Sequence, residues 1–330
     1  MQTFSVVTTW GEQHWDLYAK RSVQSIIDNW PKDTQKFFYP DNINQQIEAE
    51  NTSYISLKAV QPTFADFAER HKNSALVKTK MAEATDNKFV FDVVRFAHKV
   101  YAVIDAAERA NTEQLIWIDA DTVTYKTIPQ EWLDHIAPLE KFTTFIGRPK
   151  KGYSECGFVS YNLASFHAQE FFARWKDYYE SDKWNTLKGF TDCHTYDAVR
   201  TQMVTEGKIS DNDLNDGRFL GYRGSKHPFV NSELGDYMDH LKGERKDIKN
   251  SSKDMKVFPD TCARSGKPVM KAFIESLQGE NIIICKNNER PDCDVVVMWS
   301  WLLGMYGRDS IYNHYKNKAK FLILEVGGTG

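Results

Sequence analysis

Two aspartates, Asp119 and Asp121, follow directly after the apolar run 115–118 in this 330-residue chain. In an extended segment the side chains of residues i and i+2 point the same way, so both carboxylates can face one point. Their mutual repulsion would be removed by a divalent cation, which could also bind diphosphate oxygens. The alternative is a solvated turn with two capping aspartates. A position just after a buried strand favours the metal site, because ligands of open α/β sheets bind beyond the carboxyl ends of strands.

Two cations, Arg95 and Lys99, lie four residues apart in the stretch 86–110, upstream of the acidic pair. Apolar residues recur there with a helical period, and Asp86 or Asn87 is placed to cap the helix. Like charges four residues apart share a helix face and repel each other unless an anion neutralises them. A nucleotide phosphate would be such an anion, and pairing of Arg95 with Asp92 is the alternative.

The elements that must position these residues alternate between strands and helices. Strand patterns occur at 4–9, 36–39, 115–118, 142–146 and 156–161, and helical patterns at 14–28, 86–110 and 163–180. Strand, helix and strand within forty residues predict a parallel α/β unit. The polar stretch 181–256 shows little periodicity, so we expect a long irregular segment, which in compact proteins is usually functional or mobile.

A second unit is predicted from a change of composition near residue 257. Three apolar runs of strand length occur at 282–285, 295–299 and 321–324, with a helical pattern at 308–318. The sequence therefore predicts a main α/β domain over 1–256 and a small α/β unit over 257–330. The chain ends in three glycines and a threonine soon after the last strand, which suggests that this unit is truncated.

The composition is that of an ordinary soluble protein. Hydrophobic residues make up 41% and charged residues 26%, with a net charge of -3, so the whole chain is not a basic surface for nucleic acid. The five cysteines include no Cys-x-x-Cys pair, which argues against a disulfide framework or structural zinc and favours a reducing cytoplasm. No run of 18 apolar residues and no signal-peptide pattern occurs, so we expect a cytoplasmic protein without a membrane span.

The order of these motifs resembles the GT-A glycosyltransferase superfamily, whose hallmark is an Asp-x-Asp motif after a strand. The resemblance covers roughly residues 1–250 and includes the opening strand, the helix with Arg95 and Lys99, Asp119-Ala120-Asp121, and the stretch 156–159. It implies a Rossmann-like mixed sheet flanked by helices that binds a nucleotide sugar, most often a UDP-sugar, through Mn²⁺ or Mg²⁺ and transfers a hexose or pentose. The donor-binding residues it implies here are Thr8, Thr9, Arg95, Lys99 and Asp119.

A third metal ligand is implied by the resemblance to members of the glycogenin kind, which use a histidine followed by glycine and lysine. The stretch 239–246 is similar, although it lacks the Lys-Pro-Trp ending of that motif. His240 would then join Asp119 and Asp121, binding through a neutral imidazole nitrogen. The cations Lys242, Arg245 and Lys246 would neutralise the leaving diphosphate. The alternatives are His227 as the ligand and an exposed basic loop.

An inverting transferase needs a general base beside the acceptor hydroxyl. The two candidates are Asp192, in the stretch 189–194, and Glu155, just before Cys156. A surface carboxylate or a helix cap is the alternative for each, and inverting and retaining transfer both stay open.

The acceptor is expected to be a glycan or small molecule first and a hydroxymethylated DNA base second. The DNA alternative comes from two segments near the end of the chain, 295–299 and 319–327, which look similar to extensions on phage and bacterial glycosyltransferases. A flipped base would need an aromatic-walled pocket. Aromatic residues predicted near the acceptor side are Tyr153, Phe158, Trp184, Phe190 and Tyr222, and a local basic run occurs at 148–151.

Three other functions remain open on the sequence. The stretch 119–123 fits the Asp-x-Asp-x-Thr/Val pattern of haloacid-dehalogenase-type phosphatases, in which the first aspartate is the nucleophile. That family places its motif on the first strand, whereas more than a hundred residues precede it here. A nucleotidyltransferase would also use paired carboxylates with Mg²⁺, but 8–12 is a poor match to its glycine-rich loop. A non-catalytic protein that binds sugars or partners would also suit the aromatic content of 13%.

Overall fold

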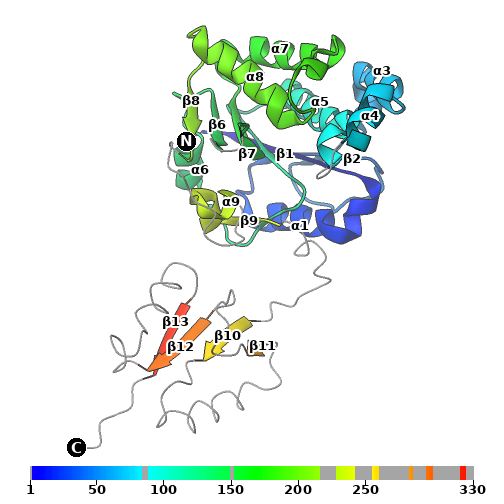
Figure 1. Cartoon of the computed structure of the whole chain (residues 1–330). Helices are drawn as coiled ribbons and strands as arrows, with labels where there is room; N and C mark the ends of the chain where they lie inside the picture. Colours follow the sequence, from blue (N-terminus) through cyan, green and yellow to red (C-terminus); the bar gives the residue numbers. More distant parts are fainter. Residues whose placement is uncertain are drawn as a thin grey trace, which may run out of the picture. The chain divides into compact units, whose positions relative to one another are not determined.

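The structure is a computed structural model that describes residues 2–83, 88–148, 152–215 and 228–241, together with four strands between 255 and 324. The chain divides into two compact units, Met1–Asp247 and Ile248–Gly330. Each unit is described separately (Figure 1).

A mixed seven-stranded sheet forms the centre of the first unit, in the order β3-β2-β1-β4-β7-β6-β8 (Figure 1). Strands β1 to β4 run parallel, β7 is antiparallel to both β4 and β6, and β8 is parallel to β6. The strands are β1 Phe4–Trp10, β2 Gln35–Pro40, β3 Thr52–Tyr54, β4 Gln114–Ile118, β6 Thr143–Ile146, β7 Glu155–Asn162 and β8 Asp211–Asp213. This mixed sheet with its flanking helices confirms the predicted α/β class.

Helices cover both faces of the sheet. They are α1 Lys20–Asn29, α2 Leu57–Val60, α3 Pro62–His71, α4 Ala75–Glu83, α5 Val93–Arg109, α6 Gln130–Ile136, α7 Ala168–Glu180, α8 Asp192–Thr205 and α9 Pro228–Asn231. One cluster of buried residues joins α3, α5, α7 and α8 to the sheet, and a second joins α1, α6 and α9 to its other face. The sheet is therefore the middle layer of three.

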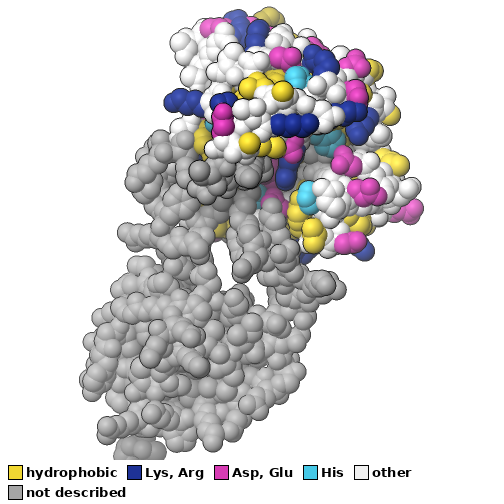
Figure 2. Space-filling model, turned by 45° about the vertical axis from the view of Figure 1, so that its right-hand side comes forward, with side chains coloured by type: hydrophobic (Ala, Val, Ile, Leu, Met, Phe, Trp, Pro, Cys, Tyr) yellow, Lys and Arg dark blue, Asp and Glu magenta, His cyan; other side chains and the backbone are white. Residues whose placement is uncertain are grey.

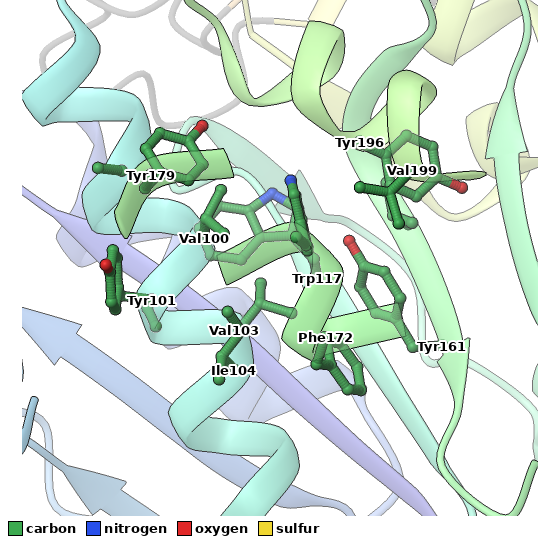
Figure 3. Packing of buried hydrophobic residues seen from close by; sticks show 14 of the residues in the cluster. Val100, Tyr101, Val103, Ile104, Trp117, Tyr161, Phe172, Tyr179, Tyr196 and Val199 are labelled. Atoms are coloured by element: carbon green, nitrogen blue, oxygen red, sulfur yellow. The ribbon is translucent and has the colours of Figure 1, made fainter. Parts of the chain in front are cut away.

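Alternating residues of the central strands divide between the two clusters, as the two-residue period of a strand requires. On β4, Leu115 and Trp117 belong to the cluster with α5, whereas Ile116 and Ile118 belong to the cluster with α1. Figure 3 shows Trp117 among side chains from three of the covering helices, α5, α7 and α8. Burial on both faces explains why residues 115–118 of β4 are all apolar, and it holds the end of this strand in place.

The connection order places a topological switch point between β1 and β4. The chain runs from β1 outward through β2 to β3, and then returns to place β4 on the other side of β1. In open α/β sheets, ligands bind in the crevice outside the carboxyl ends of the strands at such a point. Trp10 ends β1 and Ile118 ends β4, so Asp119 and Asp121 follow directly at this crevice.

The helix predicted at 86–110 begins later than expected. A 3-10 turn at Lys88–Phe91 comes first, and α5 starts at Val93 after its N-cap, Asp92. The Asp92 carboxylate accepts the backbone N–H of Arg95 at 3.3 Å, which satisfies a donor of the first turn. The proposed cap is thus corrected from Asp86 or Asn87, which lie outside the described residues, to Asp92.

The prediction of a long irregular stretch over 181–256 is wrong for much of its length. It contains a 3-10 turn at Lys183–Thr186, α8, β8, α9, a 3-10 turn at Glu233–Asp236 and β9 Met238–His240. Helix α8 is held by Tyr196, Val199 and Met203, all buried in the cluster around α5. Its buried face also includes Asp192 and Thr195, so the apolar pattern in the sequence is interrupted.

The second unit contains a parallel four-stranded sheet in the order β11-β10-β12-β13. Its strands are β10 Met255–Pro259, β11 Ile282–Ile284, β12 Val295–Trp299 and β13 Lys320–Leu324. Three of them match the predicted strands, and β10 was not predicted. The helix expected at 308–318 lies outside the described residues. Within the described part of the chain, no helix has the length and apolar character needed to span a membrane.

Candidate metal and nucleotide site

The acidic pair lies on a tight turn between β4 and the short strand β5 Thr122–Thr124. The Asp119 N–H donates to the carbonyl of Gly157 on β7 at 2.9 Å, and the Thr122 N–H donates to the carbonyl of Asp119 at 2.9 Å. These two bonds fix the backbone on both sides of the turn. The Asp121 residue is 7% exposed, so its carboxylate lies in a largely dry environment.

A two-stranded antiparallel sheet brings His240 to the acidic pair. Strand β5 pairs with β9, and Thr122 lies opposite His240 in the register. The Leu241 N–H also donates to the carbonyl of Asp121 at 2.8 Å. His240 Nε2 consequently lies 2.8 Å from Asp121 Oδ1 and 3.4 Å from Asp119 Oδ2.

The structure thus assembles the three predicted metal ligands, Asp119, Asp121 and His240. One ligand atom from each lies within 4.8 Å of the others. Carboxylate oxygens suit hard cations such as Mg²⁺ and Mn²⁺, and an imidazole nitrogen suits transition metals. The donor set of this cluster therefore fits Mn²⁺.

Gly157 on β7 leaves the space that the His240 ring occupies. A Cβ at this position would lie 2.5 Å from two ring atoms of His240 and 3.0 Å from Glu155 Oε1. His240 is itself fully buried, and Phe229 of α9 packs edge-on against its ring at 5.4 Å. The ring therefore has little room to move aside.

Replacing Gly157 by alanine is expected to push His240 away from the acidic pair. We expect Mn²⁺ binding to weaken by about 10- to 100-fold, the range found when groups that orient a metal ligand are lost. Electron paramagnetic resonance of free Mn²⁺ would measure the affinity. Gly189→Ala is the matched control, because its Cβ would meet the ring of His194 at 2.5 Å instead. Equal Mn²⁺ affinity in the two variants would contradict the packing role of Gly157.

The other ring nitrogen of His240 faces a carboxylate. His240 Nδ1 lies 3.5 Å from Glu155 Oε1, and Glu155 Oε2 forms an ion pair with Arg148 at 2.8 Å. Burial alone would lower the pKa of Arg148, but Glu155 raises it, so this guanidinium stays charged. A carboxylate on the far nitrogen of a histidine fixes the ring orientation and makes the near nitrogen a better ligand. The geometry favours this positioning role for Glu155.

Lys99 links the acidic pair to Asp192. Its Nζ lies 3.1 Å from Asp119 Oδ1 and 2.7 Å from Asp192 Oδ2, and it donates to the carbonyl of Cys156 at 2.6 Å. Burial alone would lower the pKa of Lys99, but Asp119 and Asp192 raise it well above its usual value. Burial raises the pKa of Asp192, and Lys99 opposes that change. Trp117 also donates to Asp119 Oδ1, at 2.7 Å.

Several carboxylates gather at this site among the described residues. The described residues there include the carboxylates of Asp119, Asp121, Glu155 and Asp192 and the cations Lys99 and Arg148. Carboxylates close together repel each other where water is excluded, and a divalent cation bound between them would relieve that repulsion.

Tyr18 is a residue of this site that the sequence analysis missed. It lies in a π-helical turn, Trp15–Ala19, and is 8% exposed. Burial, Asp121 and Asp119 raise its pKa well above the usual value, and Arg95 opposes this change. The acidic pair and Arg95 thus act electrostatically on this phenol. Isolated π-helical turns often occur at functional sites, but the sequence carries no clear signal for one.

The other predicted donor-binding residues are placed in different ways. Thr8 is fully buried, and the Thr9 hydroxyl contacts the carbonyl of Tyr39 at 2.5 Å and His98 Nδ1 at 2.8 Å. Arg95 is exposed on α5, whereas Lys99 is buried. The remaining predicted cations and the alternative histidine, Lys242, Arg245, Lys246 and His227, lie outside the described residues.

The predicted aromatic wall on the acceptor side is mostly wrong. Phe158, Trp184 and Phe190 are at most 3% exposed and pack within the two core clusters, so they face no accessible space. Tyr153 is half-buried, between Arg148 and His194, at 4.5 and 4.6 Å from its ring. Tyr222 lies outside the described residues.

No protein-family model and no curated protein sequence matches the chain. Similar solved structures include the apo form of WbbM, a bifunctional glycosyltransferase, at 14% identity and a TM-score of 0.39, over 64% of this chain and 39% of that one. They also include apo mouse xyloside xylosyltransferase 1, at 8% identity and a TM-score of 0.40, over 66% of this chain and 91% of that one. The matched region thus spans well under half of the WbbM chain.

Proposed function

We propose that the chain is a metal-dependent glycosyltransferase of the GT-A type, in which Asp119, Asp121 and His240 hold Mn²⁺ or Mg²⁺. The observation that carries this proposal is the meeting of the three ligands beside the switch point between β1 and β4. That crevice is where open α/β sheets bind nucleotides. A bound ion would supply charge neutralisation for the donor's diphosphate.

The donor is proposed to lie across the carboxyl ends of β1 and β4. The Thr9 side chain already contacts Tyr39 and His98, so we propose that the backbone of 8–10 contacts the nucleotide. Arg95 is exposed on α5 and opposes the rise in the pKa of Tyr18, and we propose that it contacts a phosphate of the donor. A UDP-sugar carrying a hexose or pentose remains the preferred donor, with Lys242, Arg245 and Lys246 as proposed diphosphate contacts.

Asp192 and Glu155 remain the candidate carboxylates for catalysis. Asp192 is buried in its ion pair with Lys99, and Glu155 is held between Arg148 and His240. Both are thus fixed in orientation, which suits groups that hold a substrate or a ligand in place. We propose that Asp192 and Lys99 together position the transferred sugar, and that Glu155 positions His240.

The acceptor is proposed to be a glycan or small molecule before hydroxymethylated DNA. Arg148, the only described member of the basic run 148–151, is 14% exposed in its side chain and is paired with Glu155. On the face drawn in Figure 2, basic and acidic side chains are interspersed over the described part of the chain. A DNA-binding face needs clustered cations to contact successive phosphates. In line with the net charge of -3, we keep the glycan or small-molecule acceptor as the first proposal.

A screen of nucleotide sugars with the full chain tests this proposal. We expect Mn²⁺ to stimulate the release of nucleoside diphosphate from one donor or a few, and chelation by EDTA to abolish it. Release of inorganic phosphate from a generic phosphoester instead would identify a phosphatase. Release of pyrophosphate from a nucleoside triphosphate would identify a nucleotidyltransferase, and binding of a sugar without turnover would favour a non-catalytic protein.

A second assay tests the acceptor with the donor found in that screen. Labelled sugar would be offered with DNA containing hydroxymethylcytosine, with unmodified DNA and with a panel of glycans. We expect transfer to a glycan or small molecule. Transfer to the modified DNA alone would reverse this order of acceptors.

A further inference from the structure

Two cysteines lie together beside the proposed sugar-positioning pair. Cys156 is on β7, and Cys193 follows Asp192 in the first turn of α8. The two Sγ atoms and a carboxylate oxygen of Asp192 lie within 4.8 Å of one another. Both thiols are free; Cys156 is buried and Cys193 is partly exposed. The proposed transferase chemistry uses neither sulfur atom.

A soft metal ion is the first occupant to consider for two sulfurs and a carboxylate. The Lys99 ammonium group, however, lies 2.7 Å from Asp192 Oδ2 and donates to the carbonyl of Cys156. A second cation there would be repelled in a buried environment. A reaction between the two sulfurs fits these surroundings better.

We propose that Cys156 and Cys193 form a reversible disulfide when a peroxide reaches the site, and that this disulfide inhibits the enzyme. The more exposed Cys193 thiol reacts first: its sulfur takes one oxygen from hydrogen peroxide to give a sulfenic acid, and the other oxygen leaves as water. The Cys156 sulfur then displaces the sulfenic oxygen, which leaves as a second water. Two thiols and one peroxide thus give one disulfide and two waters.

The disulfide would disturb the groups around it because a sulfur–sulfur bond is only about 2.05 Å long. Its formation draws the start of α8, with Asp192, toward β7. The Cys156 carbonyl accepts from Lys99, and the next residue, Gly157, packs against His240. A displacement of about 1 Å in a catalytic site can lower the rate by about 100-fold. We expect the disulfide to lower the rate of donor hydrolysis at least tenfold, and this part of the inference rests on the proposed function.

The test uses the full chain and the Cys262→Ser/Cys285→Ser/Cys293→Ser variant, which keeps only this pair. After treatment with hydrogen peroxide, intact mass should show the loss of two hydrogens, and peptide mapping should recover a Cys156–Cys193 cross-link. Donor hydrolysis and Mn²⁺ affinity should fall together and recover with dithiothreitol. Cys193→Ser should form no cross-link and keep its activity under the same treatment.

The mass readout separates this inference from the proposed function. A Cys156–Cys193 cross-link with lower Mn²⁺ affinity would support the switch even if no nucleotide sugar were hydrolysed. A cross-link confined to the other cysteines of the full chain, or oxidation without any cross-link in the triple variant, would overturn it. Equal loss of activity in Cys193→Ser and in the unmodified chain would overturn the claim that this disulfide inhibits.

Discussion

Asp121→Asn is expected to abolish Mn²⁺-dependent donor hydrolysis and to weaken Mn²⁺ binding by at least about 100-fold. Loss of a group that merely supports a metal ligand costs about 10- to 100-fold in affinity, and Asp121 is placed as a ligand. Asparagine keeps the shape and a hydrogen-bond acceptor for His240 but removes the negative charge. Titration of Mn²⁺ followed by electron paramagnetic resonance would give the affinity, and release of nucleoside diphosphate would give the activity.

The stability of the same variant separates a metal ligand from a purely structural carboxylate. In the absence of metal, the carboxylate of Asp121 lies close to that of Asp119, so removing its charge relieves the repulsion between them. We therefore expect Asp121→Asn to melt at the same temperature as the unmodified chain, or higher, in EDTA. Mn²⁺ should raise the melting temperature of the unmodified chain only, because an ion stabilises a protein that binds it in the folded state.

Asp66→Asn serves as the matched control, since Asp66 is exposed on α3. It should leave both Mn²⁺ affinity and donor hydrolysis unchanged. Full activity in Asp121→Asn, or the same melting behaviour with and without Mn²⁺ in the unmodified chain, would remove the metal site from the proposal.

The sequence predicts an element or a site best where a short stretch of residues carries the whole pattern. Strand β4 is buried on both faces, so its residues 115–118 appear as an apolar run, and the acidic pair after it is visible without the structure. The sequence places α8 poorly because its buried face includes Asp192 and Thr195, whose polar groups are satisfied by Lys99 and by Trp175 and Tyr179. Tertiary contacts of this kind leave no periodic pattern.

The pairing of β5 with β9 cannot be predicted from nearby residues either, for a different reason. Each strand has three residues, and the contact between Asp121 and His240 joins positions 119 residues apart in the chain. Only the likeness to a family motif pointed to His240, and no residue pattern near it indicated the small sheet. The role of Gly157 was equally hidden, because the space it leaves is filled by a side chain from that distant strand.

Lys99→Met is expected to lower the free energy of unfolding by about 3 kcal/mol, because breaking a buried ion pair by removing one partner leaves an uncompensated charge. Asp119 and Asp192 would then face each other across the space left by the ammonium group. The double variant Lys99→Met/Asp192→Asn should recover part of the loss, since the orphaned charge of Asp192 is gone. Denaturant unfolding of the four proteins of this double-mutant cycle would measure the coupling between the two residues.

Lys80→Met is the matched control for this loss. Lys80 forms an ion pair with Glu83, but both side chains are exposed, and such pairs contribute about 0–1 kcal/mol. If Lys99→Met is no less stable than Lys80→Met, the buried pair does not hold α8 against β4.

A different result would follow if Lys99 served only the donor phosphate: donor hydrolysis would fall in Lys99→Met, while Asp192→Asn would leave both stability and activity intact. The ion pair predicts instead that Lys99 and Asp192 are coupled in stability before any donor is added.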